Sequence, residues 1–261
     1  MIILLKYLLL ILNTIHFTLS LNCDCGYFDS STNAVWSTMY HLNFQHPSLS
    51  TNNHSILYNN HRQDLFFANY TIPAKYNDPY SRIFHRDNVR LTKDSLEIMI
   101  TRSDIIQCGG VGTRRHNFLF GSFRAYIKTT HVHGTVSAFY IYNSPTAEID
   151  IEILSALPEP RPIYFAIHPN LFESNGKASV LTHGSARLLL PFNNSDPTHD
   201  FHEYRIDWFP GLVVFYLDGY EAYRSTTNVM RVPSRVMLNH WTDGNPKFSQ
   251  GPVKENATIR T

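Results

Sequence analysis

The sequence predicts an all-β protein built as a sandwich or jelly roll. Short segments rich in β-branched and aromatic residues follow one another through most of the chain, and Gly, Pro and Asn turns separate them. No segment keeps a helical apolar period over about 10–12 residues, so we expect no long helix. Because 43% of the 261 residues are apolar, the chain can bury a substantial core, which excludes simple disorder.

The first residues have the composition of a secretory signal peptide. Met1–Leu12 is apolar apart from Lys6, and the small residues Thr18 and Ser20 suit cleavage before Leu21. A buried N-terminal strand is the alternative, but a strand does not need so long an apolar lead. We therefore expect residues 1–20 to be a signal peptide and the mature protein to be secreted, either extracellular or in the cell wall.

Residues 21–63 are expected to form an extended segment that leads into the sandwich, with one strand near Ala34–Met39. This segment holds Cys23 and Cys25, and the third cysteine of the chain is Cys108. Three cysteines allow at most one internal disulfide, and Cys23 and Cys25 are too close together to bridge easily. We therefore expect Cys108 to pair with one of them. A Cys-x-Cys metal site would need further ligands at suitable spacing, which we do not find, so no metal is expected.

From residue 64 to residue 261 the pattern predicts a single jelly-roll domain. Apolar runs and alternations bounded by turn residues predict strands, in order, at Leu96–Thr101, Gly121–Thr129, Val136–Tyr142, Glu148–Leu154, Ile163–His168, Ala186–Leu190, His202–Trp208, Val213–Leu217, Glu221–Ser225 and Val236–His240. Asp218-Gly219 predicts a type I′ hairpin turn between two of these strands, because both central residues of that turn need positive φ.

Charge, hydropathy and sequons indicate whether the chain binds nucleic acid, spans a membrane or carries N-glycans. Twenty-two Lys and Arg balance 21 Asp and Glu, and without a basic block there is no electrostatic signature of nucleic-acid binding. No apolar run reaches about 18 residues, so we expect no membrane span in the mature chain. Four Asn-x-Ser/Thr sequons could carry N-glycans, at Asn53, Asn69, Asn193 and Asn256.

The most informative segment is a predicted strand that carries three acids. Side chains alternate between the faces of a strand, so Glu148, Asp150 and Glu152 share one face and the three isoleucines between them share the other. Glu148 and Glu152 leaning toward each other bring their carboxyl groups to about 6 Å, near the separation in retaining glycosidases. A solvated acidic face on an edge strand is the alternative, but three carboxylates in register without an interleaved Lys or Arg make it the less favoured one.

This acidic segment, Glu148-Ile149-Asp150-Ile151-Glu152, resembles the active-site signature of glycoside hydrolase family 16, the concanavalin A-like jelly-roll glucanases. The resemblance runs from about Asp64 to the end of the chain. The chain particularly resembles a secreted fungal branch of the family that also begins with a Cys-x-Cys-Gly segment, here Cys23–Gly26. Further segments resemble the family's strands in the same order: Gly121–Lys128, Gly134–Phe139, Phe201–Trp208, Phe215–Gly219 and Leu238–Trp241.

The resemblance implies a concanavalin A-like sandwich of two antiparallel sheets that acts on a β-glucan of the cell wall. Glu148 would be the nucleophile, Glu152 the general acid/base and Asp150 an auxiliary carboxylate, in a retaining double displacement that ends in hydrolysis or in transfer to another sugar. Such a mechanism requires no metal or organic cofactor.

The same resemblance implies sugar-binding roles for Trp241, His168 and Tyr140. For His168 a buried, hydrogen-bonded histidine is about as good an interpretation, and Trp241 could instead belong to the core. Val136 stands where many family members have a Trp, which removes a sugar-stacking surface. The chain also ends where Asn256–Arg260 resembles only the start of the closing strand, so we expect a short or truncated strand there. These two departures favour the alternative function, a non-catalytic carbohydrate-binding wall protein on the same fold.

Overall fold

The computed structural model describes residues 26–44, 64–75, 78–155, 162–168, 185–189 and 196–261. The expected signal peptide, Cys23, Cys25, Asn53 and Asn193 lie outside the described residues. The chain divides into two compact units, one up to His41 and one from Leu42 to Thr261. No helix among the described residues is long and apolar enough to cross a membrane.

The described part of the first unit is a small antiparallel hairpin. Its strands are β1 (Tyr27–Asp29) and β2 (Ala34–Trp36), with Tyr27 opposite Trp36. Asn33, at φ 51°, takes the positive-φ position in the turn between them, which Asn tolerates better than most residues. β2 lies within the range Ala34–Met39 that the sequence predicts, whereas β1 was not expected.

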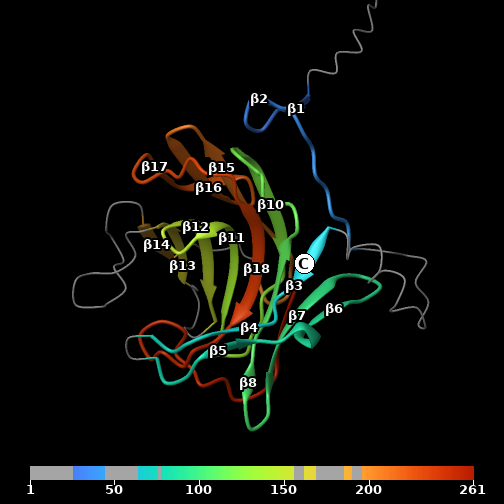
Figure 1. Cartoon of the computed structure of the whole chain (residues 1–261), viewed down its shortest axis with the longest axis vertical. Helices are drawn as coiled ribbons and strands as arrows, with labels where there is room; N and C mark the ends of the chain where they lie inside the picture. The colour runs from blue at the N-terminus through green and yellow to red at the C-terminus, as the bar shows by residue number, and fades with distance from the viewer. Residues whose placement is uncertain (1–25, 45–63, 76–77, 156–161, 169–184, 190–195) are drawn as a thin grey trace, which may run out of the picture. The chain divides into compact units, whose positions relative to one another are not determined.

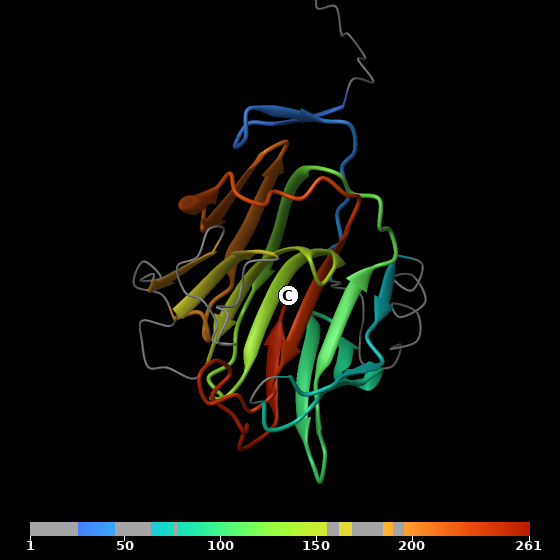
Figure 2. The same cartoon turned by 60° about the vertical axis from the view of Figure 1, so that its left-hand side comes forward.

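The second unit contains a seven-stranded antiparallel sheet in the order β14-β13-β12-β11-β18-β9-β3 (Figure 1). Its strands are β3 (Leu65–Phe67), β9 (Gly109–Thr113), β11 (Val136–Ser144), β12 (Ala147–Leu154), β13 (Pro162–Ile167), β14 (Ser185–Leu189) and β18 (Arg235–Trp241). In both overall views β12, in yellow-green, lies beside β11 and inside the sheet (Figure 2). The strand with the three acids is therefore not an edge strand.

The second layer of this unit joins two four-stranded sheets. One has the order β10-β15-β16-β17, and the other has the order β19-β7-β6 with β8 paired to β7. A bridge between Lys128 and Arg260 connects them. The bounds are β6 (Val89–Leu91), β7 (Leu96–Arg102), β8 (Ile106–Gln107), β10 (Gly121–Ile127), β15 (His202–Phe209), β16 (Leu212–Leu217), β17 (Tyr220–Ser225) and β19 (Ala257–Arg260).

Smaller elements complete the second unit. β4 (Tyr70–Ile72) and β5 (Arg82–Phe84) form a two-stranded sheet, and a single 3₁₀ turn, η1, spans Arg86–Asn88. The predicted turn between β16 and β17 is confirmed, because Asp218 and Gly219 have φ 49° and 79°. The C-terminal strand β19 has four residues and pairs with β7.

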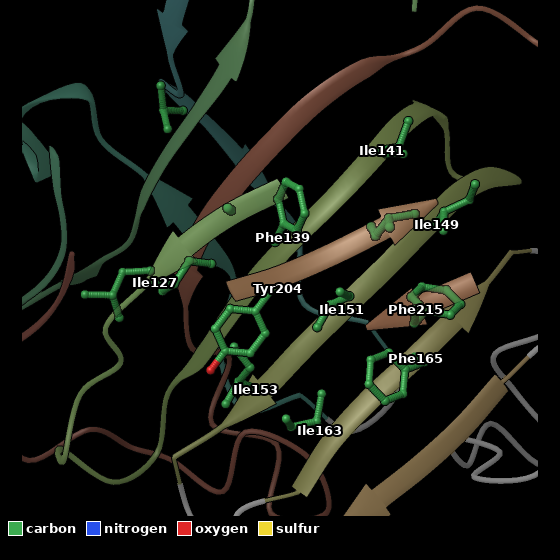
Figure 3. Close-up of a cluster of buried hydrophobic side chains, with 14 of the residues drawn as sticks. Ile127, Phe139, Ile141, Ile149, Ile151, Ile153, Ile163, Phe165, Tyr204 and Phe215 are labelled. Carbon is green, nitrogen blue, oxygen red and sulfur yellow. The ribbon is translucent and has the colours of Figure 1, made fainter. Parts of the chain in front are cut away.

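The core lies between the two layers and fixes which face of β12 is buried. Ile149, Ile151 and Ile153 are at most 2% exposed and pack in one cluster with Phe165 of β13 and Tyr204 of β15 (Figure 3). Each fully buried isoleucine contributes about 1.5–3 kcal/mol relative to an exposed one. A register slip of one residue would expose all three, so this packing holds the acids on the opposite face.

The expected disulfide of Cys108 is wrong. Cys108 is a free thiol and 1% exposed, in an apolar cluster with Phe84 and Trp241, and its Sγ lies 3.7 Å from the carbonyl oxygen of Thr242. Burial raises the pKa of the thiol to about 11, so it is protonated and unreactive near neutral pH. The expected disulfide rested on the number and spacing of the cysteines, which do not indicate whether a cysteine is buried.

Candidate active site

Glu148, Asp150 and Glu152 lie on the face of the seven-stranded sheet that points away from the core, which we call the acid face. Strand β12 runs between β11 and β13, so each acid has a neighbour on both sides. On β11, Tyr140 lies opposite Asp150, and on β13, Tyr164 lies opposite Glu152. The predicted alignment of the three acids on one strand face therefore agrees with the register of the sheet.

His168 follows β13 directly and contacts two of the acids. Its backbone N–H donates to the carbonyl oxygen of Glu148 at 3.0 Å, which continues the pairing of β13 with β12. Its Nε2 lies 2.9 Å from Oδ2 of Asp150 and 3.6 Å from Oε2 of Glu148. The side chains of Glu148, Asp150 and His168 are 18%, 6% and 16% exposed, so this contact is largely shielded from water.

Burial and mutual repulsion raise the pKa of all three acids. For Glu148 the causes are burial first and the neighbouring Asp150 second, and its pKa rises well above the usual range. Burial, followed by the charge of Glu152, raises the pKa of Asp150 in the same way. Burial and Glu148 raise the pKa of Glu152 to about 7. At mildly acidic pH the row therefore retains protons that isolated carboxyl groups would have lost.

A hydrogen bond between the side chains of Glu148 and Asp150 raises the pKa of Glu148 and lowers that of Asp150, so Glu148 is the donor of this bond. Oδ1 of Asp150 is buried and has no hydrogen-bond partner among the described atoms. The donor atoms of Glu148, Asp150 and His168 also lie within 4.8 Å of one another, a spacing that a metal ion can span. Because His168 already faces Asp150 at 2.9 Å, we interpret the group as a proton-sharing cluster.

Tyr140 lies on the acid face opposite Asp150, but only 7% of its surface is exposed. Nδ2 of Asn239, on β18, donates to its hydroxyl oxygen at 2.6 Å. Burial raises the pKa of Tyr140 well above the usual value, so the phenol is neutral. In this arrangement Tyr140 packs beside Asp150 and exposes little surface to a sugar ring. Its role as a sugar contact therefore stays a prediction.

Trp241 is likewise mostly covered, with 5% of its surface exposed. The guanidinium carbon of Arg82 lies 4.6 Å from the centroid of the indole, and the ring of Phe248 stacks almost parallel to it at 6.0 Å. Phe248 in turn packs against Tyr164, with ring centroids 5.1 Å apart. Phe248 and Tyr164 are half-buried, so they present more aromatic surface near Glu152 than Trp241 does.

Sequence reasoning missed Arg82, Asn239, Tyr164 and Phe248, which all lie near the predicted site residues. Tyr164 and Asn239 follow from the strand register once the neighbours of β12 and β11 are known, but the sequence alone does not give strand order. Arg82 comes from the separate β4–β5 sheet, and no spacing in the sequence points to it. A cavity of about 330 Å³ is lined by other residues, Phe66, Phe67, Asn69, Arg86 and Arg114.

Several known proteins with related sequences are named β-glucanases. A β-glucanase of Paenibacillus polymyxa is 28% identical over 163 residues, which are 59% of this chain and 62% of the relative. A xylanase/β-glucanase of Ruminococcus flavefaciens is 31% identical over 49% of this chain and 15% of its own length. Congo red hypersensitive protein 2 of Saccharomyces cerevisiae is 27% identical over 51% of this chain and 28% of its own length. The chain thus spans less than two thirds of each.

Solved structures share the fold. The Bacillus licheniformis β-glucanase superimposes with a TM-score of 0.61 at 20% identity, over 76% of this chain and 89% of that protein. The endo-β-1,3-glucanase of Pyrococcus furiosus gives a TM-score of 0.52 at 22% identity, over 69% and 78%. The family model "Glycosyl hydrolases family 16" matches residues 76–258, which include the whole acid row. The chain therefore belongs to family 16 of the glycosyl hydrolases.

Proposed function

We propose that this chain cleaves internal β-linkages of a β-glucan, or transfers the cleaved chain to another sugar, by a retaining double displacement. The observation that carries this proposal is the row of Glu148, Asp150 and Glu152 on one face of an inner strand, in a member of family 16. Relatives named β-glucanases support a β-glucan as the substrate.

In the first step the Glu148 carboxylate attacks the anomeric carbon and forms a glycosyl ester, while the glycosidic C–O bond breaks. Glu152 gives its proton to the leaving oxygen, a role that suits a carboxyl group with a pKa of about 7. The hydrogen bond between the two side chains raises the pKa of Glu148 and lowers that of Asp150, which places the shared proton on Glu148 before the reaction. Asp150 must take up this proton so that Glu148 attacks as the anion. In the second step Glu152 removes a proton from water or a sugar hydroxyl, which attacks the ester and releases Glu148.

We further propose that the protein is exported and acts on cell-wall polysaccharide. The apolar leader over residues 1–20 supports export. Two of the four sequons fall on described residues, and both Asn69 and Asn256 are exposed, as N-glycosylation requires. Treatment of the secreted protein with a peptide N-glycosidase is expected to lower its apparent mass. An unchanged mass would argue against glycans at these sites.

The decisive experiment is glucan cleavage by the purified protein beside Glu148→Gln. Mixed-linkage β-1,3/1,4-glucan, laminarin and chitin are offered, and the products are identified by mass spectrometry. We expect the parent to release oligosaccharides and Glu148→Gln to lose about 10⁴-fold in turnover, because the nucleophile is gone. Products longer than the substrate would identify transfer.

Glu255→Gln is the matched control, because Glu255 is an exposed glutamate outside the acid row. It is expected to keep full activity. The catalytic proposal is wrong if the parent cleaves none of these polysaccharides but binds one of them, and Glu148→Gln binds that polysaccharide with the same affinity. The non-catalytic carbohydrate-binding function would then replace it.

A further inference from the structure

Arg82 is a half-buried cation that has no ionic partner of its own. It lies on β5, outside the seven-stranded sheet, and its guanidinium group is placed over the Trp241 ring at 4.6 Å. No hydrogen bond or ion pair links its side chain to another described residue, unlike Arg90 and Arg260, which both bind Glu97. A half-buried guanidinium without a hydrogen-bond acceptor is uncommon, because losing water contacts costs free energy that a partner normally restores.

Trp241 holds this guanidinium group in a favourable orientation for a ligand. A guanidinium that stacks on an indole keeps its N–H groups at the edges of its plane, directed sideways rather than into the ring. Its attraction to the ring also limits the side-chain freedom that would be lost on binding. The N–H donors are thus fixed in place and remain unpaired within the described protein.

The position of Arg82 relative to the acids places these donors near the reacting groups. Its positive charge lowers the pKa of both Glu148 and Glu152, an effect that requires proximity at this side of the sheet. On the acid face, the residues between Trp241 and β12 are small: Val136 lies opposite both Trp241 and Leu154, and Ala138 lies opposite Glu152. No bulky side chain of β11 occupies these two positions.

We propose that Arg82 is a substrate-contacting residue, whose guanidinium group donates hydrogen bonds to sugar hydroxyl groups beside Glu152. It would take the place of the sugar-stacking surface that the family resemblance implies for Trp241. Two N–H groups on one edge of a guanidinium can reach two adjacent hydroxyl oxygens of a glucosyl ring, which would fix the orientation of that ring. This inference rests on the proposed action on β-glucan.

The test measures oligosaccharide binding separately from turnover. Glu148→Gln serves as the background, so that the oligosaccharide produced from the best glucan is bound without being cleaved, and calorimetry gives its Kd. Arg82→Met keeps the length of the side chain but removes every donor, and Arg82→Lys keeps the charge without the planar edge. Arg231→Met is the matched control, because Arg231 is exposed and away from the acid row.

We expect Arg82→Met to weaken binding at least tenfold, Arg82→Lys to weaken it less, and Arg231→Met to leave it unchanged. In the otherwise unmodified enzyme, Arg82→Met should raise KM more than it lowers kcat, a division that a general loss of folding would not produce. Melting curves of all variants show whether any of them is unfolded. If Arg82→Met is unfolded, the Kd of Arg82→Lys, which retains a cation over the indole, decides whether Arg82 contacts the substrate.

Two results would overturn the inference in distinguishable ways. If the parent cleaves β-glucan while Arg82→Met and Arg82→Lys bind the oligosaccharide as tightly as Arg231→Met, Arg82 does not contact the substrate and the proposed function stands. If the parent neither binds nor cleaves any of the β-glucans, the proposed function fails and the role of Arg82 fails with it.

Discussion

Glu152 lies opposite Tyr164 and Ala138 on the neighbouring strands, and in the proposed mechanism its pKa of about 7 would set the basic limit of activity. The general acid must be protonated, so kcat should fall about tenfold per unit as the pH rises beyond that pKa. At low pH the activity should fall again, because protonation removes the nucleophilic anion of Glu148. The expected profile of kcat is a bell, and a rate that stays constant between about pH 4 and 8 would contradict both assignments.

Asp243 provides an independent test of the fall in kcat at basic pH. Its negative charge is one of the causes that raise the pKa of Glu152, after burial and Glu148. Removing the charge in Asp243→Asn should therefore lower the pKa of Glu152 and move the basic limb of the kcat profile to lower pH, by less than about one unit. A shift to higher pH would contradict this sign. Asp94→Asn, at an exposed position, is the control with the same change in charge.

The residues that the sequence could predict are those whose placement depends on one strand alone. Alternation along β12 puts the three acids on one face whatever lies beside them, and no partner strand is needed for that inference. The partners of Trp241 could not be predicted, because Arg82 and Phe248 reach it from a separate sheet and from the loop after β18. Nor does residue type alone reveal that a tryptophan of the acid face is 5% exposed.

Strand β9 is rich in glycine, which has a low strand propensity, but its glycines leave room for the side chains of the neighbouring strand. Gly110 lies opposite Asn239, and a Cβ added to it would lie 2.5 Å from Oδ1 of Asn239. The Gly110→Ala substitution should displace Asn239 and weaken its hydrogen bond to Tyr140, with a loss of about 1–3 kcal/mol in the free energy of unfolding. Urea denaturation measures this loss.

The double variant tests whether the loss arises from that contact. In Asn239→Ala the obstructing oxygen is absent, so adding Gly110→Ala should cost clearly less than it does in the parent. Additive losses would show that Gly110 is needed for another reason, such as its close approach to Ala68 and Phe84.

The elements that the sequence predicted and those that it missed differ in length and composition. Strands of five residues or more with clear apolar patterning, such as β11, β12 and β15, were predicted within a few residues of their observed ends. Three-residue strands such as β3 and β5 contain too few residues to show a period of two. β9 was missed because Gly109-Gly110-Val111-Gly112 has low strand propensity, although its glycines make room for Asn239 and Met237.

His240 and Glu152 are buried ionisable residues with opposite effects on the pH dependence of stability. His240 of β18 is 0% exposed, its Nδ1 lies 3.1 Å from the carbonyl oxygen of Ile98, and burial lowers its pKa from 6.5 to about 4. Between these values the unfolded chain binds more protons, so the free energy of unfolding falls as the pH falls. For Glu152, raised from 4.5 to about 7, the folded protein binds more protons, and the free energy of unfolding falls as the pH rises.

Denaturation with urea at several pH values should separate these two contributions. His240→Gln is expected to abolish a loss of about 3 kcal/mol between pH 6.5 and 4, the 2.5-unit shift at about 1.4 kcal/mol per unit. His199→Gln, at a side chain 81% exposed, should leave the pH dependence of the parent unchanged. Relative to the parent, Glu152→Gln should gain about 3 kcal/mol in the free energy of unfolding as the pH rises from 4.5 to 7, because the same 2.5-unit shift acts with the opposite sign. Because each comparison uses the slope with pH, a constant loss of stability in a variant does not disturb it. A slope in His240→Gln equal to that of the parent would mean that another group governs the acid sensitivity of the fold.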